Sequence, residues 1–256
     1  MTAAVTEPVA RTVRRRTALR WAVAAEWTKL LSLRSTWYLL LGALALTGLV
    51  ASATGVLTHD PNASPGDPAV VAELNGTCLV LASLAMLAVT GEQTTGGAAT
   101  ALLCVPDRVR LLTAKALTLG AAVCAAGLAC ALLGAVCGAL ALDRSRFDAA
   151  GTAGQLLAVA VHAALLGTLT LGLAAVVRRS AGTVTALFGL LFLVPVALDP
   201  VPGGETAVDL LPGGASEAWL LGGNGTLERP GGLLALLVWA LGSLLAAAVV
   251  IRRRDA

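Results

Sequence analysis

"GEQTTGGAATALLCVPDRVRLLTAK", residues 91–115, interrupts the chain between two long apolar runs. About 20 consecutive apolar residues cross the hydrocarbon core of a bilayer, so a polar break of this kind separates two membrane-spanning helices. Within the break, Thr94 or Thr95 can cap a short helix that Pro106 ends. The segment therefore predicts a short helix lying under the membrane between two spans. An ordinary interfacial turn is the alternative that the same pattern allows.

The composition of the whole chain indicates that the bilayer is its solvent. Of its 256 residues, 57% are hydrophobic and only 13% are charged, whereas about a quarter of the residues in a soluble domain carry charge. Six apolar runs are long enough to span a membrane. They cover residues 37–57, 70–90, 117–142, 155–177, 182–198 and 233–251. We expect an all-α integral membrane protein, with a flexible basic N-terminus over residues 1–16 and one six-helix domain over residues 17–256.

Lys and Arg are divided unevenly between the segments that flank these runs. Fifteen lie in the N-terminal segment, the second and fourth loops and the C-terminal tail, and three lie in the other loops. Short positively charged segments resist translocation, so the side with fifteen cations is expected to be cytoplasmic. This distribution predicts a multi-pass protein of the cell membrane with both termini, and the segment 91–115, in the cytoplasm.

A second amphipathic segment, "TALRWAVAAEWTKLLSLRSTW", precedes the first span at residues 17–37. Its apolar residues share one helical face, which predicts an interfacial helix in the headgroup region. Trp27 is expected to anchor this helix, with Glu26 and Lys29 directed away from the apolar face. Arg20 and Arg34 fall near the apolar face and would extend their charged ends toward water.

Several classes of site have no support in the sequence. The five cysteines lack the spacing of a zinc site or a redox motif. Neither of the two lysines, Lys29 and Lys115, stands in a Gly-rich phosphate-binding loop. We therefore expect no cofactor, no metal and no ATP site of that kind, and the basic residues do not indicate a nucleic-acid partner.

The arrangement resembles the permease subunits of ABC-2 type transporters, especially the compact six-helix kind found in actinobacteria. The resemblance rests on "AEWTKLLSLRSTW" before the first span and on Gly91-Glu92 with the following "VPDRVRLLTAK". Weaker support comes from "RRS" at 178–180, "LLPGGA" at 210–215 and the tail "IRRRDA". One departure follows Gly91-Glu92: many relatives carry an aromatic and a basic residue there, whereas this chain reads Gln93, Thr94, Thr95, Gly96 and Gly97.

The resemblance implies a subunit that is not itself an enzyme, forms the substrate pathway and most often exports its substrate. Its partners would be a separate ATPase subunit, a second permease subunit, identical or different, and the lipid bilayer. Residues 17–35 would be the interfacial helix, with Glu26, Trp27, Lys29 and Arg34 as its marked residues. Residues 95–105 would form the coupling helix that docks on the ATPase, and residues 208–221 short re-entrant helices. The implied coupling residues are Glu92, Thr95, Ala98, Ala99, Thr100, Leu102 and Leu103.

Other residues leave alternatives open. Glu92 pairs with Arg108 or Lys115, or is simply solvated. His162, inside the fourth run, is a functional candidate, or a neutral side chain bonded to a neighbouring helix. Small residues in the third run predict a close-packing face, within the subunit or between subunits. These are Gly120, Gly127, Gly134 and Gly138.

Two competing functions are a membrane scaffold or sensor without transport, and an intramembrane enzyme. The enzyme would use Ser216 and His162 as nucleophile and base. We expect this pair to fail, because Ser216 falls in an outer loop, His162 lies inside a span and the sequence offers no third group to orient the imidazole.

Overall fold

The computed structural model describes residues 7–57, 64–94, 108–141, 149–198, 200, 204–223 and 226–254. These residues form α-helices and two short π-helical turns, η1 and η3, and their only β-type pairing is an isolated bridge between Gly223 and Glu228. The elements are α1 (Glu7–Ser32), α2 (Arg34–Leu57), α3 (Asp67–Ala72), η1 (Glu73–Thr77), α4 (Cys78–Thr94), α6 (Arg108–Ala141), α7 (Ala149–Val177), α8 (Ser180–Phe188), η3 (Gly189–Leu193), α9 (Val194–Leu198), α10 (Gly204–Leu210), α11 (Pro212–Leu221) and α12 (Arg229–Arg254).

Six helical segments in the described part of the chain are long and apolar enough to cross a membrane. They run over Arg34–Leu57, Asp67–Gly91, Val109–Ala141, Ala149–Val177, Ser180–Leu198 and Arg229–Arg253. The prediction of an all-helical chain with six such segments is therefore confirmed. The third segment begins at Val109, earlier than the predicted 117, because the residues around Lys115 continue the helix toward the preceding loop.

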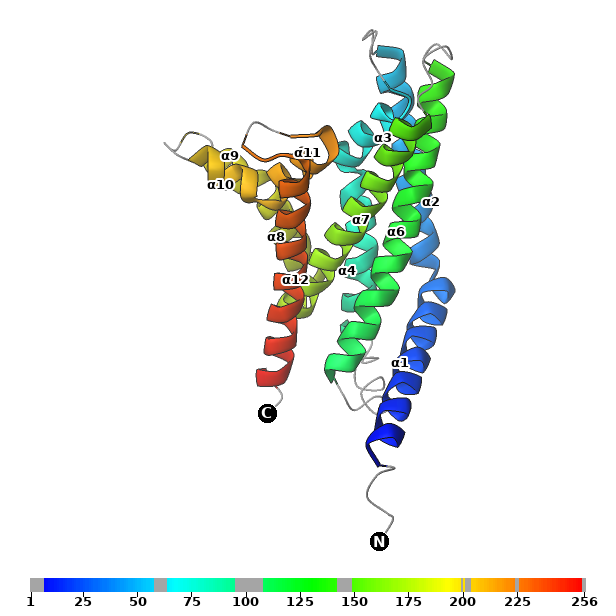
Figure 1. Cartoon of the computed structure of the whole chain (residues 1–256), viewed down its shortest axis with the longest axis vertical. Helices are drawn as coiled ribbons and strands as arrows, with labels where there is room; N and C mark the ends of the chain where they lie inside the picture. The colour runs from blue at the N-terminus through cyan, green and yellow to red at the C-terminus, as the bar shows by residue number, and fades with distance from the viewer. Residues whose placement is uncertain are drawn as a thin grey trace.

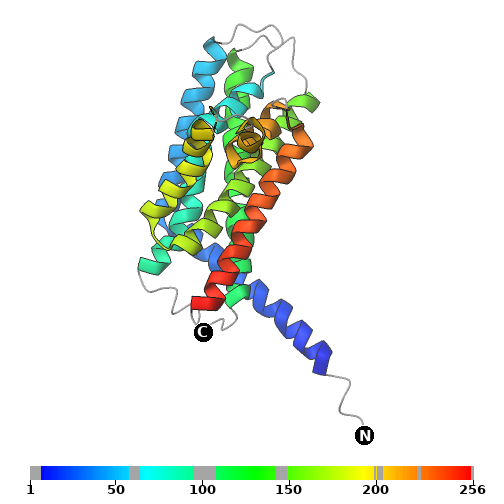
Figure 2. The same ribbon diagram turned by 90° about the vertical axis from the view of Figure 1, so that its left-hand side faces the viewer.

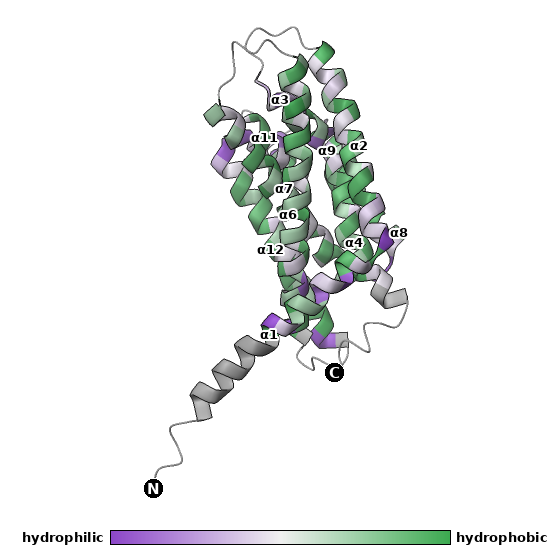
Figure 3. Cartoon of the chain, turned by 90° about the vertical axis from the view of Figure 1, so that its right-hand side faces the viewer, coloured by the Kyte–Doolittle hydropathy of each residue, from purple (hydrophilic) through white to green (hydrophobic). Residues whose placement is uncertain are grey.

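The spans form a bundle in which α7 is the central helix (Figure 1). It packs against α6, α12, α4, α8 and α11, and it buries more of its apolar stretch than any other described span. The start of α1 and the end of α12 lie at the same end of the bundle, the lower end in Figure 1, while α3 and the short helices α10 and α11 lie toward the opposite, upper end. Apolar residues cover the spans along their length (Figure 3).

Helix α1 leaves the lower end of the bundle obliquely rather than running parallel to the spans (Figure 2). It begins at Glu7, so residues 7–16 of the N-terminal stretch expected to be flexible are helical. Pro8 is compatible with this start, because proline at the first turn of a helix lacks only an N–H that has no intrahelical partner. The helix ends at Ser32, and Leu33 separates it from α2.

The second span is a broken helix. Between α3 and α4, Asn75 leaves helical geometry and Gly76 takes φ +125°, a conformation that glycine adopts at little cost. Non-helical backbone at membrane depth is tolerated only where protein or water meets its polar groups. Here the Asn75 side chain donates a hydrogen bond to the carbonyl of Val71 at 2.8 Å. The break places Glu73 in the bundle interior.

The glycines of α6 that were expected to pack closely face other elements of the same chain. A Cβ atom at Gly127 would lie 2.6 Å from the Cβ of Ala163 on α7, and one at Gly134 would lie 2.7 Å from Ala69 on α3. At Gly138 it would collide with the backbone carbonyl of Pro65, whereas Gly120 has only ordinary contact with Thr168. Three of the four glycines thus let α6 approach its neighbours within the subunit.

Replacing Gly127 with Ala should lower the stability of the bundle by about 1–3 kcal/mol, because the added methyl group has no room between α6 and α7. Gly42→Ala is the matched control, since Gly42 lies on α2 with no atom within 4 Å of its missing Cβ. The control should be neutral or stabilise by up to about 1 kcal/mol through helix propensity. Thermal unfolding midpoints in detergent test this, and equal midpoints for the two variants would contradict the packing argument.

Candidate functional site: two buried polar clusters

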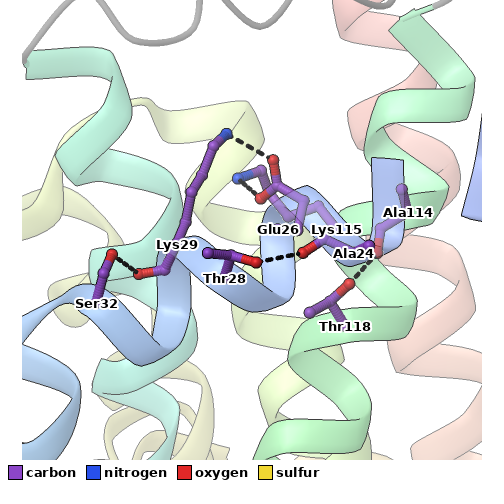
Figure 4. Close-up of polar contacts among 8 residues, drawn as sticks. All are labelled: Ala24, Glu26, Thr28, Lys29, Ser32, Ala114, Lys115 and Thr118. Atoms are coloured by element: carbon purple, nitrogen blue, oxygen red, sulfur yellow. Dashed lines mark hydrogen bonds and ion pairs between the residues drawn. The ribbon is translucent and has the colours of Figure 1, made fainter. Parts of the chain in front are cut away.

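A buried ion pair joins α1 to α6 at the lower end of the bundle (Figure 4). Lys115 Nζ lies 2.7 Å from Glu26 Oε2, and Lys29 Nζ lies 2.8 Å from Glu26 Oε1. Glu26 is only 5% exposed and Lys115 7%. Both carboxylate oxygens of Glu26 are therefore matched by a cation, one from its own helix and one from α6.

The position of Glu26 follows from the face that α1 turns toward the bundle. Ala22, Glu26 and Leu30 recur every four residues, which places them on one side of the helix, and all three are buried. Trp27 is instead 41% exposed. The expectation that Glu26 points away from the apolar contact face is therefore wrong, because α6 presents Lys115 to it and α1 turns its bulkier apolar residues outward.

The electrostatics of this junction favour the ionised carboxylate. Burial by itself raises the pKa of Glu26, but the charges and hydrogen bonds of Lys115 and Lys29 outweigh burial and hold its pKa below the ordinary value of 4.5. A carboxyl with a depressed pKa stabilises the fold above its unfolded pKa and loses that contribution as the pH falls through the folded value.

The other predicted interfacial and coupling residues are only partly described. Arg34 begins α2, and the Trp37 indole donates a hydrogen bond to the carbonyl of Leu31 at 3.1 Å, across the α1–α2 junction. Glu92 lies in the last turn of α4. The remaining coupling residues, from Thr95 to Leu103, lie outside the described residues. Lys115, one of the two cations considered for Glu92, pairs with Glu26.

A second polar cluster lies inside the bundle, where η1, α7 and α11 meet. His162 Nδ1 is 3.0 Å from Glu73 Oε1, and His162 Nε2 is 2.8 Å from Ser216 Oγ. Ser216 Oγ also donates a hydrogen bond to the carbonyl oxygen of Pro212 at 2.5 Å. Glu73 and His162 are each 1% exposed and Ser216 is 4% exposed. One imidazole thus connects three separate elements.

The structure brings Ser216 and His162 into contact, contrary to the expectation that they lie apart. Ser216 lies in helix α11 and not in a loop, and α11 packs against α7, which carries His162. Glu73 is the third group beside the imidazole that the sequence did not reveal. A carboxylate inside an apolar run is costly, and that cost is the signal that could have identified it.

The surroundings of this cluster fix α11 in place. The Trp219 indole donates to the carbonyl of Ala158 on α7 at 2.9 Å, and the Arg229 Nε donates to the carbonyl of Trp219 at 3.1 Å. Nearer the kink, the Thr47 and Thr77 hydroxyls share a buried hydrogen bond at 3.1 Å. The cluster is therefore part of a closed, well-connected interior.

Chemically, the order carboxylate, imidazole, hydroxyl is the one used by serine hydrolases. Two features distinguish the present cluster from such a site. The hydroxyl hydrogen of Ser216 is directed at Pro212, and all three side chains are closed off from the surface. The arrangement as it stands can hold protons and connect helices.

No protein-family model matches this chain, and no curated protein matches it either.

Removing one partner of the lower ion pair should loosen α1. Glu26→Gln replaces a carboxylate partner of the buried Lys115 with a neutral amide, which costs up to about 3–5 kcal/mol unless α1 detaches and both groups regain water. We expect faster tryptic cleavage near Lys29 and a lower unfolding midpoint. The double variant Glu26→Gln/Lys115→Gln should recover most of the loss, and Arg20→Gln, on the exposed side of α1, should have no effect. Equal cleavage rates and equal unfolding midpoints for Glu26→Gln and Arg20→Gln would contradict this role.

Lowering the pH should also loosen α1 in the unmutated protein. Because the pKa of Glu26 is depressed in the folded protein, the attachment of α1 should persist at neutral pH and weaken as the pH falls below 4.5 through the folded pKa. Fluorescence of a probe attached near the start of α1, followed during acid titration, measures this. The Glu26→Gln variant should lack the transition, and an identical transition in that variant would assign it to other carboxyls.

Proposed function

We propose that this protein is the transmembrane permease subunit of an ABC transporter of the ABC-2 type, an exporter driven by a separate ATPase subunit. Six helices long and apolar enough to span a membrane support the first half of this proposal. The resemblance in the segments before the first span and after the second supports the rest. Both termini would be cytoplasmic, so the lower end of the bundle would face the ATPase.

The observation that carries the proposal is the joint between α1 and α6. Residues 91–115 connect the end of α4 to the beginning of α6, and Lys115 on α6 is ion-paired with Glu26 on α1. A force applied to this segment from the cytoplasm would act on α4 and α6 together, and the ion pair would carry α1 with them. A permease that is moved by an external ATPase needs such a connection, whereas a scaffold does not.

The outer surface of the bundle leaves room for a second permease subunit. The span made of α8, η3 and α9, and the span α12, bury only 17% of their apolar stretches within the chain. Their exposed apolar faces would contact lipid or the second subunit, which is either identical or different. In this proposal a partner supplies the energy, and the placement of Lys29 and Lys115 outside any phosphate-binding loop agrees with that.

A charge placed on the coupling segment should separate the protein from its ATPase. In Ala99→Glu or Thr100→Glu, the new carboxylate would be buried without a partner at the docking surface. It should weaken the binding of the ATPase by about 2–5 kcal/mol, as a buried unpaired charge does at an interface. The matched control is Thr206→Glu on α10, an exposed position toward the upper end of the bundle.

The measurement is co-purification of the ATPase with the tagged protein, together with substrate-stimulated ATP hydrolysis. We expect normal insertion of all variants and loss of the ATPase only in the variants at positions 99 and 100. Equal retention by these variants and the Thr206 control would refute the docking role. A tagged protein that never retains an ATPase would favour the scaffold or sensor.

A second candidate function, an intramembrane serine hydrolase, is favoured by the Glu73–His162–Ser216 geometry alone. It requires Ser216 to donate its hydrogen to His162, and the 2.5 Å bond to Pro212 directs that hydrogen elsewhere. A fluorophosphonate probe should therefore not label the purified protein at neutral pH. Labelling that is lost in Ser216→Ala would establish the hydrolase instead.

A further inference from the structure

The hydroxyl group of Ser216 determines where the other protons of the buried cluster must lie. A serine hydroxyl has one hydrogen, and a carbonyl oxygen only accepts. At 2.5 Å from the Pro212 carbonyl, that hydrogen must lie between the two oxygens, because otherwise their lone pairs would face each other. Ser216 Oγ is then an acceptor toward His162, and His162 Nε2, at 2.8 Å, must carry a hydrogen.

The hydrogen on the other nitrogen of the imidazole can be placed in the same way. With a hydrogen on Nε2, a neutral His162 presents a lone pair at Nδ1. An ionised Glu73 would place a second lone pair opposite it, 3.0 Å away. The contact is a hydrogen bond only if one additional proton lies between Nδ1 and Oε1. The pair is then neutral overall, whether the proton resides on the carboxyl or on the imidazole.

The environment of Glu73 agrees with a neutral pair. Its second oxygen, Oε2, is buried and has no hydrogen-bond partner within the described part of the chain. An unmatched oxygen costs more on a charged carboxylate than on an uncharged acid. Two ionisable groups that interact electrostatically with Glu73, besides His162, are the thiols of Cys78 on α4 and Cys130 on α6, and neither thiol supplies a positive charge.

We propose that Glu73 and His162 form a buried binding site for one proton, and that its occupancy controls the attachment of α11 through Ser216. When the proton leaves, the hydrogen of Nε2 is lost, and the proton between Nδ1 and Oε1 is retained by Nδ1 as a donor to the carboxylate. His162 Nε2 then becomes an acceptor. Ser216 can donate to His162 or to Pro212 but not to both, so one of its two bonds is broken.

This inference does not depend on the proposed transport function. It concerns a ligand, the proton, and a contact between α7 and α11 toward the upper end of the bundle, whereas the permease proposal concerns the lower end. Loss of the ATPase in the coupling variants would leave it intact, and its own failure would leave the permease proposal intact.

The chain is well suited to a direct test because it has only two histidines, His59 and His162. In a His59→Gln protein with ¹⁵N-labelled histidine, reconstituted in lipid nanodiscs at pH 7, every imidazole signal comes from His162. We expect Nε2 to carry a hydrogen that exchanges slowly with solvent, and Nδ1 to be hydrogen-bonded or protonated. A hydrogen on Nδ1 with a bare Nε2 is also the proton-free state of the site, so the pH has to be varied. If that state persists unchanged from pH 8 to pH 5, the proposal is overturned and the hydrolase is favoured, whereas a hydrogen that appears on Nε2 as the pH is lowered supports the proton site.

Glu73→Gln provides the second arm, because an amide can donate to Nδ1 without being able to release a proton. We expect this variant to shift the Nδ1 resonance and to leave the hydrogen on Nε2. Glu217→Gln is the matched control, since Glu217 is exposed on α11 directly after Ser216. It should leave both resonances unchanged. A His162 spectrum unaffected by Glu73→Gln would also overturn the proposal, and the spectra of the His59→Gln protein from pH 8 to pH 5 decide the question if Glu73→Gln fails to fold.

Discussion

The hydrocarbon core of a bilayer offers no hydrogen-bond partner, so a polar group placed there raises the free energy of the fold unless it finds a partner within the protein. The spans meet this requirement mostly within single helices. The hydroxyls of Thr54, Thr118 and Thr170, for example, each donate to the carbonyl four residues earlier, at 2.7–2.8 Å. Groups that cannot be matched locally have to find a partner on another helix, and those few contacts decide how the helices are assembled.

Glu26 and Glu73 show that the partners of a carboxyl group differ between the end of the bundle and its interior. Glu26 lies at one end of the bundle, next to Lys29, whose side chain is 44% exposed. Water and two cations are available there, so the carboxylate can remain charged. Glu73 lies in the closed interior, where its partner His162 and the hydroxyl of Ser216 are equally buried. At that depth a shared proton provides the neutrality that lysines provide at the end of the bundle.

The sequence predicts the parts of the fold that depend on local pattern. Apolar run length gives all six helices, since crossing the core imposes a length that no other arrangement of the chain requires. The repeated glycines of α6 also suggested close packing, because only small residues allow the backbones of neighbouring helices to approach each other. The break at Gly76 was not predicted, since a single glycine in an apolar run is equally compatible with a continuous helix.

The polar contacts could not be predicted for a different reason. Glu26 and Lys115 are 89 residues apart, as are Glu73 and His162, and the pairing of residues so distant is determined by which helices become neighbours. Helical periodicity even assigned Glu26 to the wrong face, because an amphipathic pattern does not show whether the bundle or the lipid receives the apolar side. His162 was recognisable as unusual, yet its contacts depend on the break at Gly76, which the pattern did not reveal, and on α11, which lies in the stretch 208–221 where the family resemblance alone implied short helices.

Helix α7 connects these separate requirements. It packs against α6, which carries the ion-paired Lys115, and against α11, which carries Ser216. Since packed interiors shift between discrete arrangements more readily than they deform continuously, a displacement of α6 against α7 would be transmitted to the contacts of His162. The close approach at Gly127, where an added methyl group would lie 2.6 Å from the Cβ of Ala163, leaves little slack at that interface. Helix α7 therefore has packing interfaces both with the helix that carries Lys115 and with the helix that carries Ser216.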